Sequence, residues 1–233
     1  MREQYAEWPV RATAADLLVC AWSRSTADGP PRTYRIVPDG CVDLIWTGST
    51  LFVAGPDTQA QLATAGPGIM HGVRFRPGVA PALFGMPAAE LTDSRPAVSE
   101  LDRARFADRL PDDLAAAADP ASVLVNAVVG ALDRDRLDPA APEVLAGLRR
   151  GTPVARLAGE FGFTERTLHR RCLAAFGYGP KTVQRVLRFQ RALHLVRAGR
   201  SYADAAFEAG YADQPHLARE VRALAGVPLS LLH

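Results

Sequence analysis

A helical cassette that occurs twice near the C-terminal end is the feature that most restricts how this chain can fold. Residues 163–179 read FTERTLHRRCLAAFGYG, and residues 211–228 read YADQPHLAREVRALAGVP. Gly162 aligns with Gly210 just before these segments, and after one inserted residue, Ala212, the second halves align as well. Such a repeat predicts that one local structure is built twice.

The residues that pair between the two copies are those that a helix-turn-helix needs. A glycine can end the first helix in the left-handed conformation, an aromatic residue fills the corner, and Thr or Asp caps the second helix. Apolar residues at helical spacing then face a core. The paired positions are Gly162 with Gly210, Phe163 with Tyr211, Thr164 with Asp213, Leu168 with Leu217, Cys172 with Val221 and Gly177 with Gly226.

Most of the residues expected to point away from that core differ between the copies, although Arg170 pairs with Arg219. If each copy binds a different target sequence, we expect the structural residues to be shared and the outward-facing side chains to differ. These residues are Glu165, Arg166, His169 and Arg170 in the first copy, and Gln214, Pro215, Ala218 and Arg219 in the second. We therefore predict two helix-turn-helix units with separate specificities.

The remaining sequence after about Pro142 also has helical patterns. Proline at the first helical position and glycine just past the end mark the helix boundaries. A stripe of apolar residues marks one face of the helix that joins the two units, and Cys172 is expected to be a small buried apolar residue. The predicted helices cover 142–150, 153–162, 165–177, 181–199, 202–210 and 214–226.

The front part of the chain has a different texture. Short runs rich in β-branched and aromatic residues, at 33–37, 42–46, 51–55 and 69–75, alternate with Gly/Pro turn segments. They predict an antiparallel sheet or small barrel. Three helices are expected to follow it, at 80–91, 100–110 and 119–135.

The fold class is therefore α+β: an N-terminal β-rich sheet or small barrel with following helices, then an all-α domain of two helix-turn-helix units and a linker helix. A polar segment with two prolines, residues 134–142, separates these parts. We place the domains at 1–138 and 139–233.

Charge is distributed unevenly between the two parts. Residues 141–233 hold 14 Lys+Arg against 7 Asp+Glu, a net charge of +7, whereas residues 1–140 hold 13 against 18, a net charge of −5. Such asymmetry favours a C-terminal part that binds a polyanion, although a solvated basic face would give the same count. All the positive side chains except Lys181 are Arg, whose planar donor fork suits phosphates and guanine edges.

Two segments, RLAGEFGFTERTLHRRCLAAFGYGP and AFEAGYADQPHLAREVRALAGVPL, resemble the two helix-turn-helix units of AraC/XylS-type transcriptional regulators. The front segments PDGCVDLIW, VAGPDT and GVRFRPGVAPALFGMPAAEL resemble an uncharacterised module that often precedes such domains. The resemblance implies a non-enzymatic, sequence-specific DNA-binding regulator with an N-terminal sensing or dimerising domain. Its partners would be a double-stranded DNA operator, a small-molecule effector and, for an activator, RNA polymerase.

The resemblance also implies roles for individual residues. Base-edge contacts fall to Arg166, His169 and Arg170 in the first unit, and to Gln214, Pro215 and Arg219 in the second. Phosphate contacts fall to Thr164, Arg171, Lys181 and His216. Arg suits guanine and Gln suits adenine, whereas Pro215 offers only apolar contact, so the second unit is expected to discriminate fewer bases.

The alternative is that the front part of the chain is an enzyme. His71 is the only histidine in residues 1–140, which argues against a metal site, and no cofactor motif is present. Cys41 follows a turn at a predicted strand start and lacks a neighbouring His or Lys to activate it. We expect Cys41, Asp43, Trp46 and Arg74 to line an effector pocket; the alternative is alkylation repair or methyl sensing at Cys41.

Location and assembly are inferred from weaker signals. The three cysteines have unrelated spacings, which favours a reducing compartment, and the N-terminus has no signal peptide. We therefore expect a cytoplasmic protein without a membrane segment. Residues 121–132 carry more apolar surface than one packing face requires, which favours a homodimer.

Overall fold

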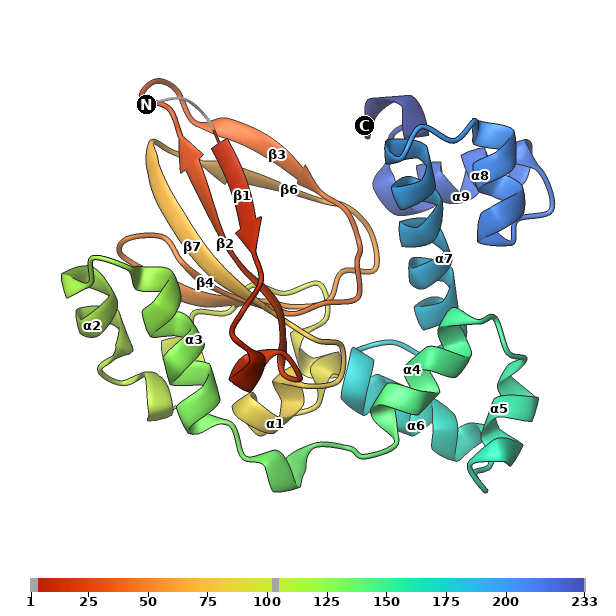
Figure 1. Ribbon diagram of the computed structural model, residues 1–233, viewed down its shortest axis with the longest axis horizontal. Helices are drawn as coiled ribbons and strands as arrows, with labels where there is room; N and C mark the ends of the chain where they lie inside the picture. The colour runs from red at the N-terminus through yellow and green to blue at the C-terminus, as the bar shows by residue number, and fades with distance from the viewer. Residues whose placement is uncertain (1–3, 102–104, 233) are drawn as a thin grey trace.

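A computed structural model of the chain describes residues 4–101 and 105–232. Two β-sheets and three short helices form a front domain, and six helices form the C-terminal part beside it (Figure 1). The front domain lies along the whole column of C-terminal helices, so that it adjoins both ends of the long helix α7 (Figure 1).

The predicted antiparallel sheet is confirmed, and it is accompanied by a second, smaller sheet. The larger sheet has the order β1-β2-β7-β4-β5, and β3 pairs with β6 in the smaller one. Every strand pair is antiparallel. The strands are β1 (Gln4–Trp8), β2 (Leu18–Thr26), β3 (Arg32–Ile36), β4 (Asp43–Trp46), β5 (Leu51–Ala54), β6 (Gln61–Ala65) and β7 (Gly68–Phe75).

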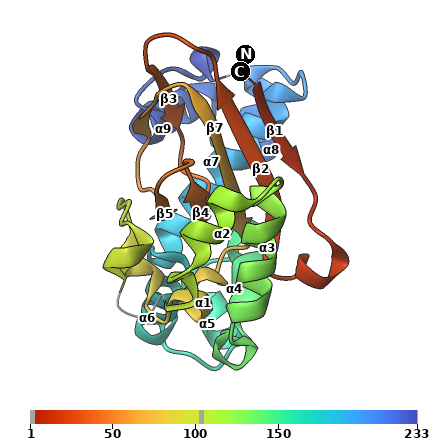
Figure 2. The same ribbon diagram turned by 90° about the vertical axis from the view of Figure 1, so that its left-hand side faces the viewer.

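The main core of the front domain lies on one face of the larger sheet. Helices α2 (Leu110–Ala116) and α3 (Pro120–Ala131) cover this face (Figure 2), and α1 (Ala80–Phe84) closes its lower end. Leu44, Val53, Val73 and Phe75 from the strands are 0% exposed there. The opposite face carries a separate small cluster around Cys20, Trp22 and Ile45.

Two of the predicted front helices are wrong in extent. The segment 80–91 is split, because Gly85 takes a left-handed conformation (φ 66°) and Pro87 follows it, leaving α1 and a 3-10 turn at Ala88–Leu91. The segment 100–110 is not one helix, since its described residues include a 3-10 turn at Arg105–Ala107 and the start of α2. Residues 102–104 lie outside the described residues.

The third front helix, α3, is confirmed, although it ends at Ala131 rather than at residue 135, and much of its apolar surface packs within the chain. Asp119 caps its N-terminus by accepting from Ser122 N. Val123, Val125 and Val129 pack against the main core of the front domain. Because α3 contributes none of the exposed large hydrophobic side chains found among the described residues, the homodimer prediction loses this support.

The predicted C-terminal helices are confirmed in order and nearly in extent. Their glycines and caps stop and start the helices as expected: Gly162 (φ 67°) and Gly210 (φ 84°) follow the first helix of each unit. Thr164 Oγ1 accepts from Thr167 N at 3.1 Å, and Asp213 Oδ1 accepts from His216 N at 2.6 Å. The helices are α4 (Ala141–Arg149), α5 (Val154–Glu160), α6 (Glu165–Phe176), α7 (Pro180–Arg197), α8 (Tyr202–Ala209) and α9 (Gln214–Ala225).

Each helix-turn-helix unit has its own hydrophobic core, and α7 belongs to both. The first core includes Val183 and Val186 from α7 together with residues of α4, α5 and α6. The second begins at Phe189, about one turn further along α7, and includes residues of α8 and α9. The linker helix is therefore a structural part of both units rather than a free spacer.

Candidate nucleic-acid interface

Helix α6, the second helix of the first unit, presents a polar face to solvent. Its predicted base-contacting residues Arg166, His169 and Arg170 are all exposed. Leu168 and Cys172 on the opposite side are 0% exposed and anchor the helix in the first core. This anchoring leaves the three candidate side chains free to enter a DNA groove.

Helix α9 repeats that arrangement in the second unit. Gln214, Pro215 and Arg219 are exposed, whereas Leu217 and Val221 are buried in the second core. Arg222 is also exposed on α9, three residues after Arg219, and sequence reasoning did not include it. The three-residue spacing from Arg219 was the available signal, because residues i and i+3 share a helix face.

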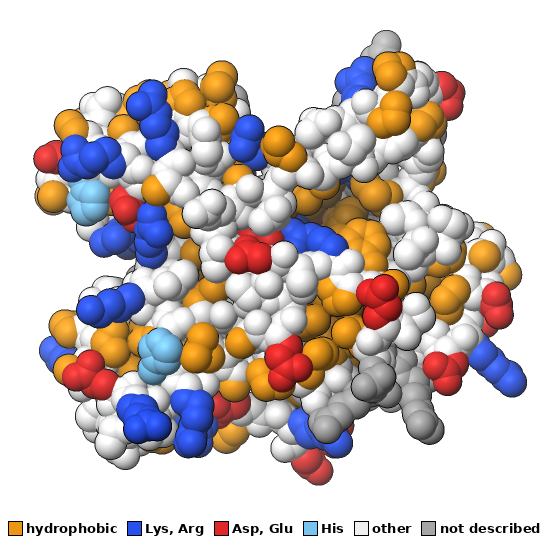
Figure 3. Space-filling model, turned by 180° about the vertical axis from the view of Figure 1, so that it is seen from behind, with side chains coloured by type: hydrophobic (Ala, Val, Ile, Leu, Met, Phe, Trp, Pro, Cys, Tyr) orange, Lys and Arg blue, Asp and Glu red, His pale blue; other side chains and the backbone are white. Residues whose placement is uncertain are grey.

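The arginines of the two units gather on one face of the molecule. Figure 3 shows a group of Lys and Arg side chains over each unit, each with a histidine, and an indentation between the units. Positive charge gathered on one face is the electrostatic pattern expected of a domain that binds the phosphate backbone of a duplex.

Three of the four predicted phosphate contacts remain available to a ligand. Lys181 is exposed in the first turn of α7. Thr164 and His216 stand at the start of the two recognition helices, where backbone N–H groups favour an anion. His216 Nδ1 accepts from Ala212 N at 3.3 Å, which leaves its Nε2 free to donate.

Arg171 is the fourth predicted phosphate contact, and it already has partners within the chain. Its Nη1 donates to both carboxylate oxygens of Asp138 at 2.9 Å, and its guanidinium lies 4.6 Å from the centre of the Phe163 ring. A phosphate would have to compete with this ion pair. Arg171 therefore joins the segment before α4 to the corner of the first unit.

The linker helix is fixed to both units by side-chain contacts. Gln184 Nε2 donates to the carbonyl oxygen of Thr152 at 2.7 Å, and Arg185 Nε donates to Glu220 Oε2 on α9 at 2.6 Å. With 18 residues, α7 is about 27 Å long at 1.5 Å per residue. Two recognition helices that share one DNA face need a separation of about 34 Å, which such a linker can provide.

In the front domain, Asp43 and Arg74 are brought together because β4 pairs with β7. Arg74 donates from Nε and Nη2 to the two carboxylate oxygens of Asp43 at 3.1 and 3.2 Å. Trp22 Nε1 also donates to Asp43, at 3.1 Å. Burial raises the pKa of the Asp43 carboxyl to about 6, although the Arg74 guanidinium acts in the opposite direction.

Cys41 lies beside this pair, and its surroundings disfavour a reactive thiolate. Its backbone N–H donates to Asp39 Oδ1 at 2.8 Å. Burial raises the pKa of the Cys41 thiol well above its usual value, and the carboxylates of Asp39 and Asp43 raise it further. Because the thiolate is the nucleophilic form, these surroundings argue against alkyl transfer to Cys41.

Trp46 is separated from the other predicted effector residues. It lies on β4 like Asp43, but it points into the main core and is 4% exposed. Sequence reasoning instead missed Arg24, whose guanidinium lies 4.9 Å from the Tyr5 ring centre and 4.3 Å from that of Tyr34. Arg24 on β2 thus stands between Tyr5 of the larger sheet and Tyr34 of the smaller one.

Two N-capped recognition helices with exposed arginines, each the second helix of a helix-turn-helix, define the C-terminal part as a DNA-binding domain. A sequence family described as a helix-turn-helix domain matches residues 157–232. Another, described as a domain of unknown function (DUF6597), matches residues 11–96. The C-terminal part is a helix-turn-helix domain of the AraC type, which supports a role in DNA-binding regulation of transcription.

Solved structures of ToxT from Vibrio cholerae resemble most of the chain at 12% identity. The structure from strain O395 covers 87% of this chain and 96% of its own, with a TM-score of 0.48. An apo variant from strain SCE256 covers 91% and 98%, with a TM-score of 0.49. Wild-type ToxT with an unsaturated fatty acid bound covers 96% and 97%, with a TM-score of 0.47. No curated protein sequence matches the chain.

Among the described residues, no helix combines the length and the apolar composition needed to cross a membrane.

Proposed function

We propose that the protein regulates transcription by binding two adjacent half-sites of one operator, one with α6 and the other with α9. The observation that carries this proposal is that both helices are capped, anchored and exposed in the same way on a shared linker helix. Helix-turn-helix proteins insert the N-terminal half of the second helix into the major groove, and these are the exposed halves.

The proposed base contacts are those of the exposed faces. Arg166, His169 and Arg170 would contact the first half-site, and Gln214, Pro215 and Arg219 the second. Thr164, Lys181 and His216 would hold phosphates, with Arg171 joining them if its ion pair with Asp138 opens. Arg can donate two hydrogen bonds to guanine, whereas Gln can pair with adenine.

The front domain would supply regulation. A small-molecule effector would bind near Asp43, Arg74 and Cys41, on the sheet face that also carries Trp22. The domain boundary would fall at residues 138 and 139, since the main front core reaches Leu137 and the first C-terminal core begins with Ala140. Contacts with RNA polymerase, in an activator, and homodimer formation would complete the regulatory assembly.

Selection of bound sites from random DNA tests the double half-site, and it should return unequal halves. The first unit presents two arginines and a histidine, whereas the second replaces two of the equivalent positions with Pro215 and Ala218, which have no hydrogen-bonding side chain. We expect fewer specified base pairs under the second unit. Equal sequence information in both halves would contradict the residue assignment, and a single conserved block would contradict the double half-site.

A further inference from the structure

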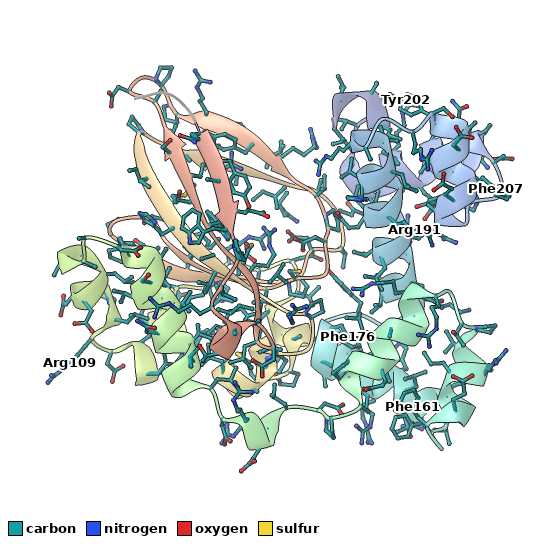
Figure 4. All side chains as sticks on the ribbon, viewed as in Figure 1. Arg109, Phe161, Phe176, Arg191, Tyr202 and Phe207 are labelled. Carbon is teal, nitrogen blue, oxygen red and sulfur yellow. The ribbon has the colours of Figure 1, made fainter. Side chains whose placement is uncertain are left out.

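The front domain holds the C-terminal end of the first recognition helix. Thr92 Oγ1 donates to the carbonyl oxygen of Gly177 at 3.1 Å, and the Tyr178 hydroxyl donates to that of Asp57 at 2.5 Å. A Cβ atom on Gly177 would lie 2.6 Å from Pro56 and 2.7 Å from Thr92. Phe176 extends from this end of α6 toward the front domain (Figure 4). The end of α6 therefore cannot move without disturbing the front domain.

The same domain holds the C-terminal end of the second recognition helix. The backbone N–H of Ala60 donates to the carbonyl oxygen of Leu224 at 2.7 Å, and Arg35 Nη1 donates to that of Ala225 at 2.9 Å. The last carbonyl groups of a helix have no partner within the helix, and a positive side chain is favoured beside them. Arg35 and Ala60 thus act as a C-terminal cap supplied by another domain.

Both sets of contacts fall at the C-terminal ends of the recognition helices, and one loop takes part in both. Gly177 and Gly226, which end the recognition helices, pair in the sequence repeat, and both take left-handed conformations. Residues 55–60, here called the bridging loop, contact the first unit through Pro56 and Asp57 and the second through Ala60. One short segment therefore joins both recognition helices.

The bridging loop is firmly held within the front domain. Asp93 accepts from the backbone N–H of Thr58 at 2.7 Å and from its hydroxyl at 2.6 Å. Asp57 is 6% exposed and pairs with Arg95 at 2.6 Å. A Cβ atom on Gly55 would lie 1.6 Å from the carbonyl oxygen of Leu91, so the loop packs directly on the neighbouring backbone. Because the bridging loop is held in one position, it can in turn hold the ends of α6 and α9 in place.

We propose that the front domain is a positioning element of the DNA-binding site. The bridging loop, Arg35 and Thr92 fix the separation and angle of α6 and α9 and thereby set the half-site spacing that the protein accepts. The contacts lie at the C-terminal ends of both helices, which leaves the N-terminal halves open to DNA. This inference rests on the proposed binding of both helices to one duplex.

The competing explanation is that α7 alone sets the spacing. The Arg185–Glu220 ion pair and the two cores already tie α7 to both units. The two explanations differ in what happens when only the front-domain contacts are removed. Arg35→Ala combined with Thr92→Ala removes donors to both recognition helices and changes no residue of the helix-turn-helix units.

A distance measurement in the full chain without DNA tests the positioning directly. Spin labels at Glu165→Cys and Gln214→Cys, in a Cys41→Ser background, report the separation of the two recognition helices; Cys20 and Cys172 are buried. We expect a narrow distance distribution that broadens in the Arg35→Ala/Thr92→Ala variant. Arg109→Ala is the matched control, because Arg109 projects from the far side of the front domain (Figure 4).

An unchanged distribution in a folded double variant would overturn the proposal. If circular dichroism showed that the double variant does not fold, Tyr178→Phe replaces it. This change removes only the hydroxyl that donates to Asp57. Broadening is again the supporting result, and a distribution equal to that of the labelled parent is the contrary one.

A series of duplexes with base pairs inserted between the selected half-sites links the positioning to DNA recognition. We expect one inserted base pair to weaken wild-type binding about tenfold and double-variant binding about threefold or less. Equal losses in both proteins would contradict this inference alone. A wild type that protects only one half-site would instead contradict the proposed function.

Discussion

Arg170→Ala is expected to weaken binding to the selected operator by about 1–3 kcal/mol and to relax the preference at one base pair. Arg170 is exposed on α6, on the opposite side from the buried Leu168 and Cys172. No ion pair of Arg170 is found among the described residues, so its donor fork is available to a base. The loss should therefore be confined to the cognate sequence.

Lys181→Ala is the control for Arg170→Ala. It also removes one exposed positive charge, from the helix that directly follows the first unit. Lys181 lies in the first turn of α7, where the helix N-terminus favours a phosphate. Its loss should weaken cognate and scrambled duplexes alike and reduce the salt slope by about one. Titrations of both variants at several salt concentrations separate the two roles. Equal weakening of both duplexes by Arg170→Ala would contradict base contact from this face of α6.

The C-terminal helices could be predicted closely because their signals are local. A capping side chain, a glycine at the end of a helix and apolar residues at helical spacing all act within one or two turns. Thr164 and Asp213 cap as expected, and the glycines that follow α6 and α9 end those helices. Repetition strengthened each signal, since two copies had to satisfy the same geometry.

The front domain was predicted less completely because its strands depend on distant partners. β2 was missed: its sequence LVCAWSRST does not alternate strictly, and a Gly/Pro turn segment, ADGPP, stands only on its C-terminal side. It becomes a strand because β1 and β7 pair with it on both sides. Trp22 lies over Gly72, where a Cβ atom would come within 2.3 Å of the indole ring. Nothing near Trp22 in the sequence indicates this contact.

Only some of the spatial relations among the predicted effector residues could be inferred from strand geometry. Asp43 and Arg74 meet because their strands pair, which a sequence cannot specify without the register. The separation of Trp46 was accessible from the sequence, because side chains alternate along a strand. Positions 43 and 46 differ by an odd number, so one strand places them on opposite faces. The contacts between the front domain and the ends of α6 and α9 gave no sequence signal, because each joins residues that are far apart in the chain.

Leu217→Ala is expected to destabilise the second helix-turn-helix unit by about 2–5 kcal/mol while leaving the first unit folded. Leu217 is 1% exposed and packs in the core that α9 shares with α8 and the end of α7. Shortening it leaves a cavity that the surrounding helices fill only in part. Because the first unit has a separate core, the loss should stay local.

Hydrogen exchange measures this locality, with Leu168→Ala as the mirror variant. Leu168 occupies the equivalent position of the repeat and is 0% exposed. We expect faster exchange in α8 and α9 for Leu217→Ala and in α5 and α6 for Leu168→Ala. On the selected operator, each variant should lose protection of its own half-site first. Equal loss of protection in both units would mean that α7 and the front domain couple them into one cooperative unit, and the prediction of independent cores would then be wrong.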